Sequence, residues 1–297
     1  GYTPASTTKL LTAAAALSRM GPADRLRTTV LRNPGADEIV LVGGGDPSLV
    51  SDGDSFEAAG YPAPARLSTL AERTAKALAD AGVRSVSLRY DAGLFHGPAR
   101  AASWANAYVT GGTAVIAPVS ALVVDYGYIG DPLNRIRSMD PARQAAELFA
   151  RQLSAAGVIV SGPIQPGAAG ARATELAGVE SPPISAVVEQ MLVASDNDIA
   201  ESLARHVALA SKQPATFDGA AATIRAAVGK LGVPIEGVQL FDGSGLSRSN
   251  AIPARTLAEL LAVAAQPKHP KLRTLLAGLP VAGFSGTLAD RAAEITT

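Results

Sequence analysis

The 297-residue sequence contains no cysteine, and it has only 3 histidines and 1 tryptophan. Without cysteine, disulfide scaffolds, thiolate zinc sites and cysteine nucleophiles are all excluded. His96, His206 and His269 lie far apart in the chain and match no ligand spacing. The sequence therefore predicts no metal site, and no motif in it calls for a cofactor.

The sequence also lacks net charge and long hydrophobic runs. Its 26 basic residues balance its 26 acidic residues, so no electrostatic pattern favours nucleic acid or an anionic membrane surface. No apolar stretch reaches the roughly 18 residues that a membrane span requires, and the first residues do not form a signal-peptide pattern. Lysine is scarce as well, with 6 lysines against 20 arginines, which makes each lysine worth examining.

Length and hydrophobic periodicity predict an α/β chain with one large domain or two ordinary ones. Amphipathic helices are predicted at 67–81 and 141–156, and each is followed by a glycine and a strand, at 83–90 and 158–160. A helix that leads into a strand in this way is typical of α/β proteins. Further helices are predicted at 6–20, 184–193, 199–210, 220–231 and 256–264, and further strands at 28–31, 39–42, 121–126 and 174–179.

Ser6 and Lys9 form the first pattern that carries chemistry. At this spacing near the start of a helix, the two side chains share one face. The positive end of the helix dipole favours a serine alkoxide, and a desolvated, neutral lysine can accept the serine proton. The pair predicts a nucleophile for acyl transfer with lysine as its base. The alternative is an N-capping serine beside a solvated lysine, and this spacing is expected about once by chance in a chain of this size.

Ser195-Asp196-Asn197 is the second such pattern. A hydroxyl and an amide in a tight turn between two helices can both point into one cleft. Ser195 could then relay a proton, while Asn197 could hold a substrate amide and orient Lys9. An ordinary turn that caps the following helix explains the same residues equally well.

Further strings occur in order along essentially the whole chain, at residues 4–9, 43–47, 181–183, 195–197, 242–248 and 279–288. Ser-x-x-Lys followed by Ser-Asp-Asn is the pairing found in penicillin-binding proteins and β-lactamases. The Gly-Gly-Gly-Asp-Pro and Asp-Gly-Ser-Gly-Leu-Ser-Arg strings are specific. Together they resemble the low-molecular-mass class C penicillin-binding proteins, which are D-Ala-D-Ala carboxypeptidases and endopeptidases that trim peptidoglycan.

The resemblance implies a transpeptidase domain, of the penicillin-binding and β-lactamase type, that is split around a smaller inserted domain. It assigns residues 1–27 and 173–297 to the transpeptidase domain and residues 28–172 to the insertion. Ser6 and Ser195 lie 189 positions apart, which is too far for a single β-lactamase-like domain and leaves room for the insertion. The family's Lys-Thr-Gly strand and the outer strands before Ser6 do not occur in the sequence, so we expect a truncated form.

The resemblance also implies the reaction. Ser6 attacks the carbonyl of the penultimate D-Ala of a peptidoglycan stem peptide, with Lys9 as the base, and forms an acyl-enzyme that water hydrolyses. Ser195 passes the proton to the leaving amine, Asn197 binds the substrate amide, and the backbone N–H of Ser6 is one oxyanion donor. β-Lactams mimic the substrate and are expected to inhibit the enzyme as slow-leaving acylating agents.

Three residues are assigned to substrate binding in the same way. Arg248 can grip a carboxylate such as that of a diaminopimelyl side chain, although a surface turn would also hold an arginine. Ser244 lies in the same string. Trp104 resembles an aromatic that some family members use to hold the free amine of the stem peptide, and a buried anchor of the inserted domain is the alternative.

Two other functions stay open at this stage. A class A serine β-lactamase would share the nucleophile and the Ser-Asp-Asn turn, although the sequence shows no obvious Glu-x-x-x-Asn deacylating element. A cell-wall binding protein could keep the fold without turnover. For each of these proteins the implied location is exported, in the periplasm or the extracytoplasmic cell envelope, with membrane or cell-wall association left open.

Overall fold

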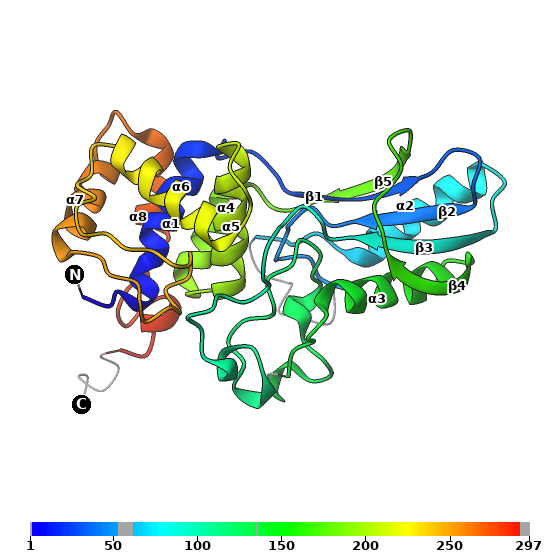
Figure 1. Ribbon diagram of the computed structural model, residues 1–297, viewed down its shortest axis with the longest axis horizontal. Helices are drawn as coiled ribbons and strands as arrows, with labels where there is room; N and C mark the ends of the chain where they lie inside the picture. Colours follow the sequence, from blue (N-terminus) through cyan, green and yellow to red (C-terminus); the bar gives the residue numbers. More distant parts are fainter. Residues whose placement is uncertain (1, 53–61, 135, 292–297) are drawn as a thin grey trace. The chain divides into compact units, whose positions relative to one another are not determined.

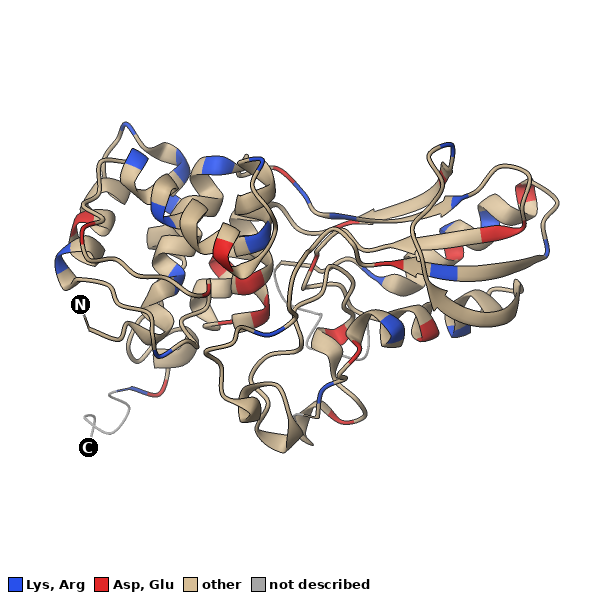
Figure 2. Ribbon diagram, in the orientation of Figure 1, with Lys and Arg blue, Asp and Glu red and all other residues tan. Residues whose placement is uncertain are grey.

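The computed structural model describes residues 2–52, 62–134 and 136–291. Contacts divide the chain into two compact units (Figure 1). The first contains residues 1–24, 96–105 and 183–297, and the second contains residues 25–95 and 106–182. Basic and acidic residues are interspersed along the chain within each unit, as expected for a chain without net charge (Figure 2).

A five-stranded mixed sheet forms the centre of the second unit. Its order is β4-β3-β2-β1-β5. Strand β1 is antiparallel to both of its neighbours, whereas β2, β3 and β4 run parallel to one another. The strands are Arg27–Arg32 (β1), Glu38–Val42 (β2), Ser85–Asp91 (β3), Ile159–Pro166 (β4) and Thr174–Glu180 (β5).

Two amphipathic helices pack on this sheet, α2 (Leu67–Asp80) and α3 (Pro141–Ala155). Their apolar side chains share one core with alternate residues of the strands, such as Val86, Leu88 and Tyr90 of β3. Burial on one sheet face explains the alternating pattern of β3. Both predicted helix–glycine–strand units are confirmed. Each helix is a crossover connection, so the strand that follows it runs parallel to its neighbour in the sheet.

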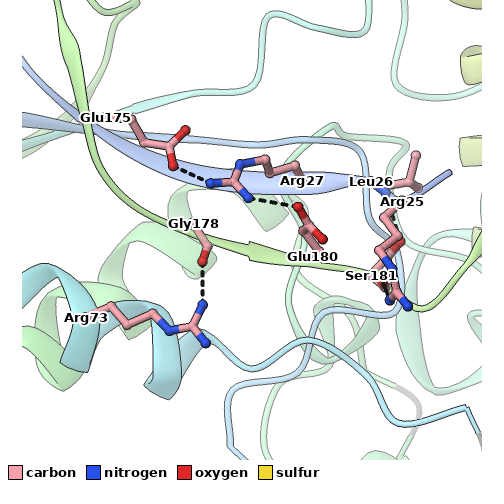
Figure 3. A network of polar contacts seen from close by, with 8 residues as sticks. All are labelled: Arg25, Leu26, Arg27, Arg73, Glu175, Gly178, Glu180 and Ser181. Atoms are coloured by element: carbon pink, nitrogen blue, oxygen red, sulfur yellow. Dashed lines mark hydrogen bonds and ion pairs between the residues drawn. The ribbon is translucent and has the colours of Figure 1, made fainter.

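The last strand of the second unit, β5, pairs with its first strand, β1. Figure 3 shows Arg27 of β1 between Glu175 and Glu180 of β5, with Arg73 of α2 donating to the Gly178 carbonyl at 2.8 Å. These exposed ion pairs contribute little free energy, but opposite charges across the strands favour this pairing. The predicted strand at 174–179 is confirmed, and its pairing places it in the second unit, outside the predicted boundary at residue 172.

The predicted strand at 121–126 is wrong. The chain forms a tight 3₁₀ turn at Asp125–Gly127, and all three residues of that turn have positive φ, which a strand cannot adopt. The backbone just before it lies against the glycine-rich string, where a Cβ on Gly43 would come within 2.4 Å of the Ala121 carbonyl oxygen. The Gly45 amide donates to that same carbonyl at 2.8 Å.

The first unit is helical in the part that the structure describes. Helix α1 (Thr8–Arg19) lies at its centre, where Leu11, Leu17 and the alanines between them are fully buried. Small side chains let neighbouring helices approach α1 closely. Those helices are α4 (Ile184–Val193), α5 (Asn197–Ala210), α6 (Phe217–Lys230), α7 (Ala254–Ala264) and α8 (Arg273–Ala277).

Each predicted helix of the first unit is present, and all of them except α4 begin two or three residues away from the predicted start. Helix α5 begins at Asn197 because the Asp196 carboxylate caps it by accepting from the Ile199 amide at 2.9 Å. Helix α6 begins at Phe217, where the Thr216 hydroxyl caps Gly219. The sequence did not predict the short helix α8. No helix in the described part of the chain is both long and apolar enough to cross a membrane.

Candidate active site

Ser6 lies in a 3₁₀ turn (Ala5–Thr7) that leads directly into helix α1. Its side chain is exposed, whereas Lys9, in the first turn of the helix, is only 1% exposed. The Lys9 Nζ atom lies 3.2 Å from the Ser6 Oγ atom. The predicted pair is therefore within hydrogen-bonding distance, with an accessible hydroxyl above a buried amine.

Lys9 is held by two further acceptors from distant parts of the chain. Its Nζ donates to Asn197 Oδ1 at 2.7 Å and to the Ser244 carbonyl oxygen at 2.9 Å. Burial lowers the pKa of Lys9 from 10.5 to about 8, although the carboxylates of Asp196, Glu201 and Asp242 act in the opposite direction. A substantial fraction of Lys9 is thus neutral near pH 8 and can accept a proton from Ser6.

Asn197 reaches Lys9 because a strained turn joins α4 to α5. Ser195 in that turn has φ 54°, a conformation that serine rarely adopts. No hydrogen bond joins its hydroxyl to Ser6 or Lys9 among the described residues. The structure therefore brings Ser6, Lys9 and Asn197 into contact and leaves Ser195 two positions away from Asn197, in the turn itself.

Residues 242–248 form a loop that contacts Lys9. Its first residue, Asp242, is buried and accepts hydrogen bonds from the Gly245 and Ser247 amides and from the side chains of Asn250 and Trp104. Four donors on one carboxylate fix the backbone of this loop. The loop in turn presents the Ser244 carbonyl to Lys9.

Gly245 of this loop packs directly on the turn that carries Ser6. Its φ is +89°, and a Cβ at this position would come within 1.9 Å of the Ala5 carbonyl oxygen. Only glycine fits both constraints, because a side chain would meet rigid backbone. The position of Ser6 is therefore coupled to the conformation of the loop that holds Lys9.

Replacing Gly245 with alanine is expected to lower the free energy of unfolding by about 3 kcal/mol, because left-handed backbone strain and a steric clash add. Gly232→Ala is a matched control, since Gly232 has φ +85° and no atom within 4 Å of its ideal Cβ position. The control should cost only about 1 kcal/mol, from backbone strain alone. Equal losses for the two variants in chemical denaturation would show that Ala5 does not constrain position 245.

Two of the predicted substrate-binding residues, Trp104 and Ser244, are buried. Trp104 is 4% exposed, its indole N–H donates to Asp242 at 2.8 Å, and its ring packs edge-on against Phe217. It is a buried anchor, as the alternative interpretation held, but it belongs to the first unit and not to the insertion. Ser244 is fully buried and contacts Lys9 through its backbone carbonyl.

Arg248 differs from these two residues. Its side chain is exposed, and no ion pair joins it to an acidic residue in the described part of the chain. Its guanidinium group can therefore meet a ligand carboxylate from solvent. The prediction of a carboxylate-binding role for Arg248 stays a prediction.

Sequence reasoning missed Glu201, which is 1% exposed on α5 and accepts hydrogen bonds from the Gly243 and Ser244 amides. It also missed Thr12, whose hydroxyl donates to the Gly243 carbonyl at 2.6 Å. A spacing signal was present for both. Glu201 lies one helical turn after Asn197, and Thr12 lies one turn after Lys9, so each shares a helix face with a predicted site residue.

Comparisons with known proteins identify the family of the chain. The family described as D-Ala-D-Ala carboxypeptidase 3 (S13) matches residues 2–135 and 131–297. A carboxypeptidase of Mycobacterium tuberculosis is 39% identical over 99% of this chain and 62% of its own length. Carboxypeptidase DacB of Mycolicibacterium smegmatis is 37% identical over 97% of this chain and 61% of its own length.

One solved structure extends the comparison to the fold. The chain resembles penicillin-binding protein 4 from Haemophilus influenzae with a TM-score of 0.79 at 22% identity, over 99% of this chain and 76% of that one. The predicted fold class is thereby confirmed. The chain spans about three fifths of the length of the two curated carboxypeptidases.

Proposed function

Because the chain belongs to the D-Ala-D-Ala carboxypeptidase 3 (S13) family, we propose that it is a serine D,D-carboxypeptidase that works through an acyl-enzyme on Ser6. One observation carries the proposal. A buried lysine amine with a lowered pKa lies 3.2 Å from an exposed serine hydroxyl, and two acceptors from distant segments hold it there. A solvated lysine beside an N-capping serine would be exposed to water and would not need these two acceptors.

In the first step, the neutral Lys9 amine takes the Ser6 proton while Oγ attacks the carbonyl carbon of the penultimate D-Ala. The carbonyl oxygen becomes an oxyanion, for which the Ser6 backbone N–H is one donor. Asn197 uses its Oδ1 atom to orient Lys9, so the Nδ2 group of the same amide is its donor for a substrate carbonyl.

In the second step, the tetrahedral intermediate collapses and the C–N bond to the terminal D-Ala breaks. The leaving nitrogen needs a proton, which travels from the Lys9 ammonium through the Ser195 hydroxyl. Water then attacks the Ser6 ester while Lys9 accepts a proton from it. Lys9 returns that proton to Ser6 Oγ as the ester C–O bond breaks and the shortened peptide leaves. The positive φ of Ser195 supports this role, because strained backbone is frequently retained at catalytic sites.

The substrate class follows from the family. We assign peptidoglycan stem peptides that end in D-Ala-D-Ala, with Arg248 as the candidate contact for a side-chain carboxylate and with D-Ala cross-links as a second cleavage target. β-Lactams would acylate Ser6 as substrate mimics. A β-lactam complex is known for the penicillin-binding protein 4 of Haemophilus influenzae. Such a substrate places the enzyme outside the cytoplasm, in the cell envelope.

The proposal is tested by incubating the protein with a stem peptide that ends in D-Ala-D-Ala and measuring the D-Ala released. A peptide that ends in D-Ala-L-Ala is the matched control, since only the stereochemistry of the leaving residue changes. We expect D-Ala release from the first peptide, no cleavage of the second, and a stable covalent adduct with a fluorescent penicillin.

Two other results would replace the proposal. Rapid turnover of a chromogenic cephalosporin without a lasting adduct would identify a serine β-lactamase. Neither peptide cleavage nor adduct formation would identify a cell-wall binding protein that keeps the fold without catalysis.

A further inference from the structure

The loop that carries Ser244 is clamped between two helices. On one side, the Thr12 hydroxyl of α1 donates to the Gly243 carbonyl at 2.6 Å. On the other side, Gly243 lies so close to α5 that a Cβ would come within 2.6 Å of the Ala204 side chain. The position of the Ser244 carbonyl, which accepts from Lys9, therefore depends on how the loop packs against α5.

Glu201 makes the polar half of this contact. Its Oε1 atom accepts from the Gly243 amide at 3.0 Å and from the Ser244 amide at 2.8 Å. The backbone of Ser244 is thus held on both sides, by Glu201 at its N–H and by Lys9 at its carbonyl. The Glu201 side chain is only 1% exposed. A substitution that removed its carboxylate would therefore leave the Gly243 and Ser244 amides without a water molecule to replace it as acceptor.

We propose that Glu201 is a positioning residue for the Lys9 base, acting through the Gly243–Ser244 backbone and through its own charge. The inference rests on the proposed function, because it assigns Glu201 to the reaction that Ser6 and Lys9 perform. Glu201 does not touch Ser6 and is not a catalytic residue. It fixes where the Lys9 amine lies and how readily that amine is protonated.

The electrostatic part depends on the charged groups that face Glu201 and Lys9. Burial and the nearby Asp242 raise the pKa of Glu201 from 4.5 to about 7, while the Ser244 amide and Arg205 act in the opposite direction. Above pH 7 the ionised carboxylate stabilises the Lys9 ammonium, as do Asp196 and Asp242. Removal of the Glu201 charge therefore lowers the pKa of Lys9 further.

Two substitutions separate position from charge. In Glu201→Gln, the amide oxygen can still accept from both backbone amides, so the loop should stay in place while the charge is lost. In Glu201→Ala, both acceptors are lost, and the Ser244 carbonyl is free to move away from Lys9. Glu236→Gln is the control, because it removes an exposed acidic charge from the same unit.

The test is the rate of acylation by a fluorescent penicillin as a function of pH. For Glu201→Gln we expect the midpoint of the acidic limb to fall by about one pH unit with an unchanged plateau. For Glu201→Ala we expect a plateau that is at least about tenfold lower. Glu236→Gln should match the wild type. A merely structural role for Glu201 would not move the midpoint in the glutamine variant.

A second measurement does not depend on catalysis. The ¹³Cε NMR signals of the 6 lysines can be titrated, and the Lys9 signal can be assigned through its absence in Lys9→Met. The Lys9 pKa should be lower in Glu201→Gln than in the wild type. An unchanged NMR titration would overturn the inference about Glu201 even if the enzyme is active. A protein that titrates as expected but never forms a penicillin adduct would overturn the proposed function, and with it any role of Glu201 in catalysis.

Discussion

Replacement of Ser6 with alanine is expected to abolish covalent labelling by penicillin and to reduce D-Ala release by at least about 10³-fold. In the proposed mechanism the Ser6 Oγ atom bonds to the substrate carbon, and among the described residues Ser6 carries the one hydroxyl that is hydrogen-bonded to Lys9. Because Ser6 is exposed in a short 3₁₀ turn, its loss should leave the free energy of unfolding almost unchanged.

Labelling is measured by in-gel fluorescence, and intact-mass spectrometry confirms the adduct. Ser18→Ala is the matched control, because Ser18 lies on helix α1, which follows Ser6, and its hydroxyl donates to the Ala15 carbonyl at 3.0 Å, away from Lys9. The control should label as fully as the wild type. If Ser6→Ala labelled equally well, Ser6 would not be the nucleophile.

Lys9→Met is expected to lower the acylation rate by about 10²- to 10⁴-fold, the usual contribution of a general base. Methionine has a similar length and no charge, so the buried site should still be filled. Lys230→Met removes an exposed lysine of the same unit and should leave the rate unchanged. A Lys9→Met enzyme that acylates at the wild-type rate would exclude lysine as the base.

The pH profile of the wild type gives a second check on Lys9. The neutral amine is the active form, so the acylation rate should rise by about tenfold for each pH unit at low pH. With the pKa of Lys9 lowered to about 8, the rate should level off above that pH. Lys9→Met should lack this limb. A wild-type rate that kept rising to pH 10 would mean that burial does not lower the pKa of Lys9.

The fold was predictable where local patterns decide it. Helices α2 and α3 and the strands that follow them are encoded by apolar spacing and by a glycine after each helix. The prediction failed at 121–126, where a short apolar run indicates a strand but the chain turns with positive φ at its end. Tertiary contacts of this segment with the glycine-rich string outweigh its strand propensity.

Boundaries were harder to predict than elements. Residues 96–105 belong to the first unit, although the segments before and after them belong to the second. Trp104 donates to Asp242 and the His96 amide donates to the Ala215 carbonyl, and both acceptors lie in the first unit. No periodicity marks such a segment, since its partners lie more than a hundred residues away in the sequence. The same long-range bond decided that Trp104 is an anchor of the first unit.

For this protein, the sequence by itself determined most of the elements and the proximity of Ser6 and Lys9. Ser6 and Lys9 lie one helical turn apart, so α-helical geometry alone brings them together. The resemblance in the other strings then identified the family. These inferences succeed because spacing along a helix and the reactivity of a side chain are local properties.

Only the tertiary structure decided the environment that lowers the pKa of Lys9. Its burial, its bonds to Asn197 and Ser244, and the nearby charge of Glu201 all come from segments about 190 to 235 positions away. Desolvation and electrostatic interaction depend on distance in space and on exclusion of water. Neither quantity can be read from the order of residues, because both arise only when the helices pack together.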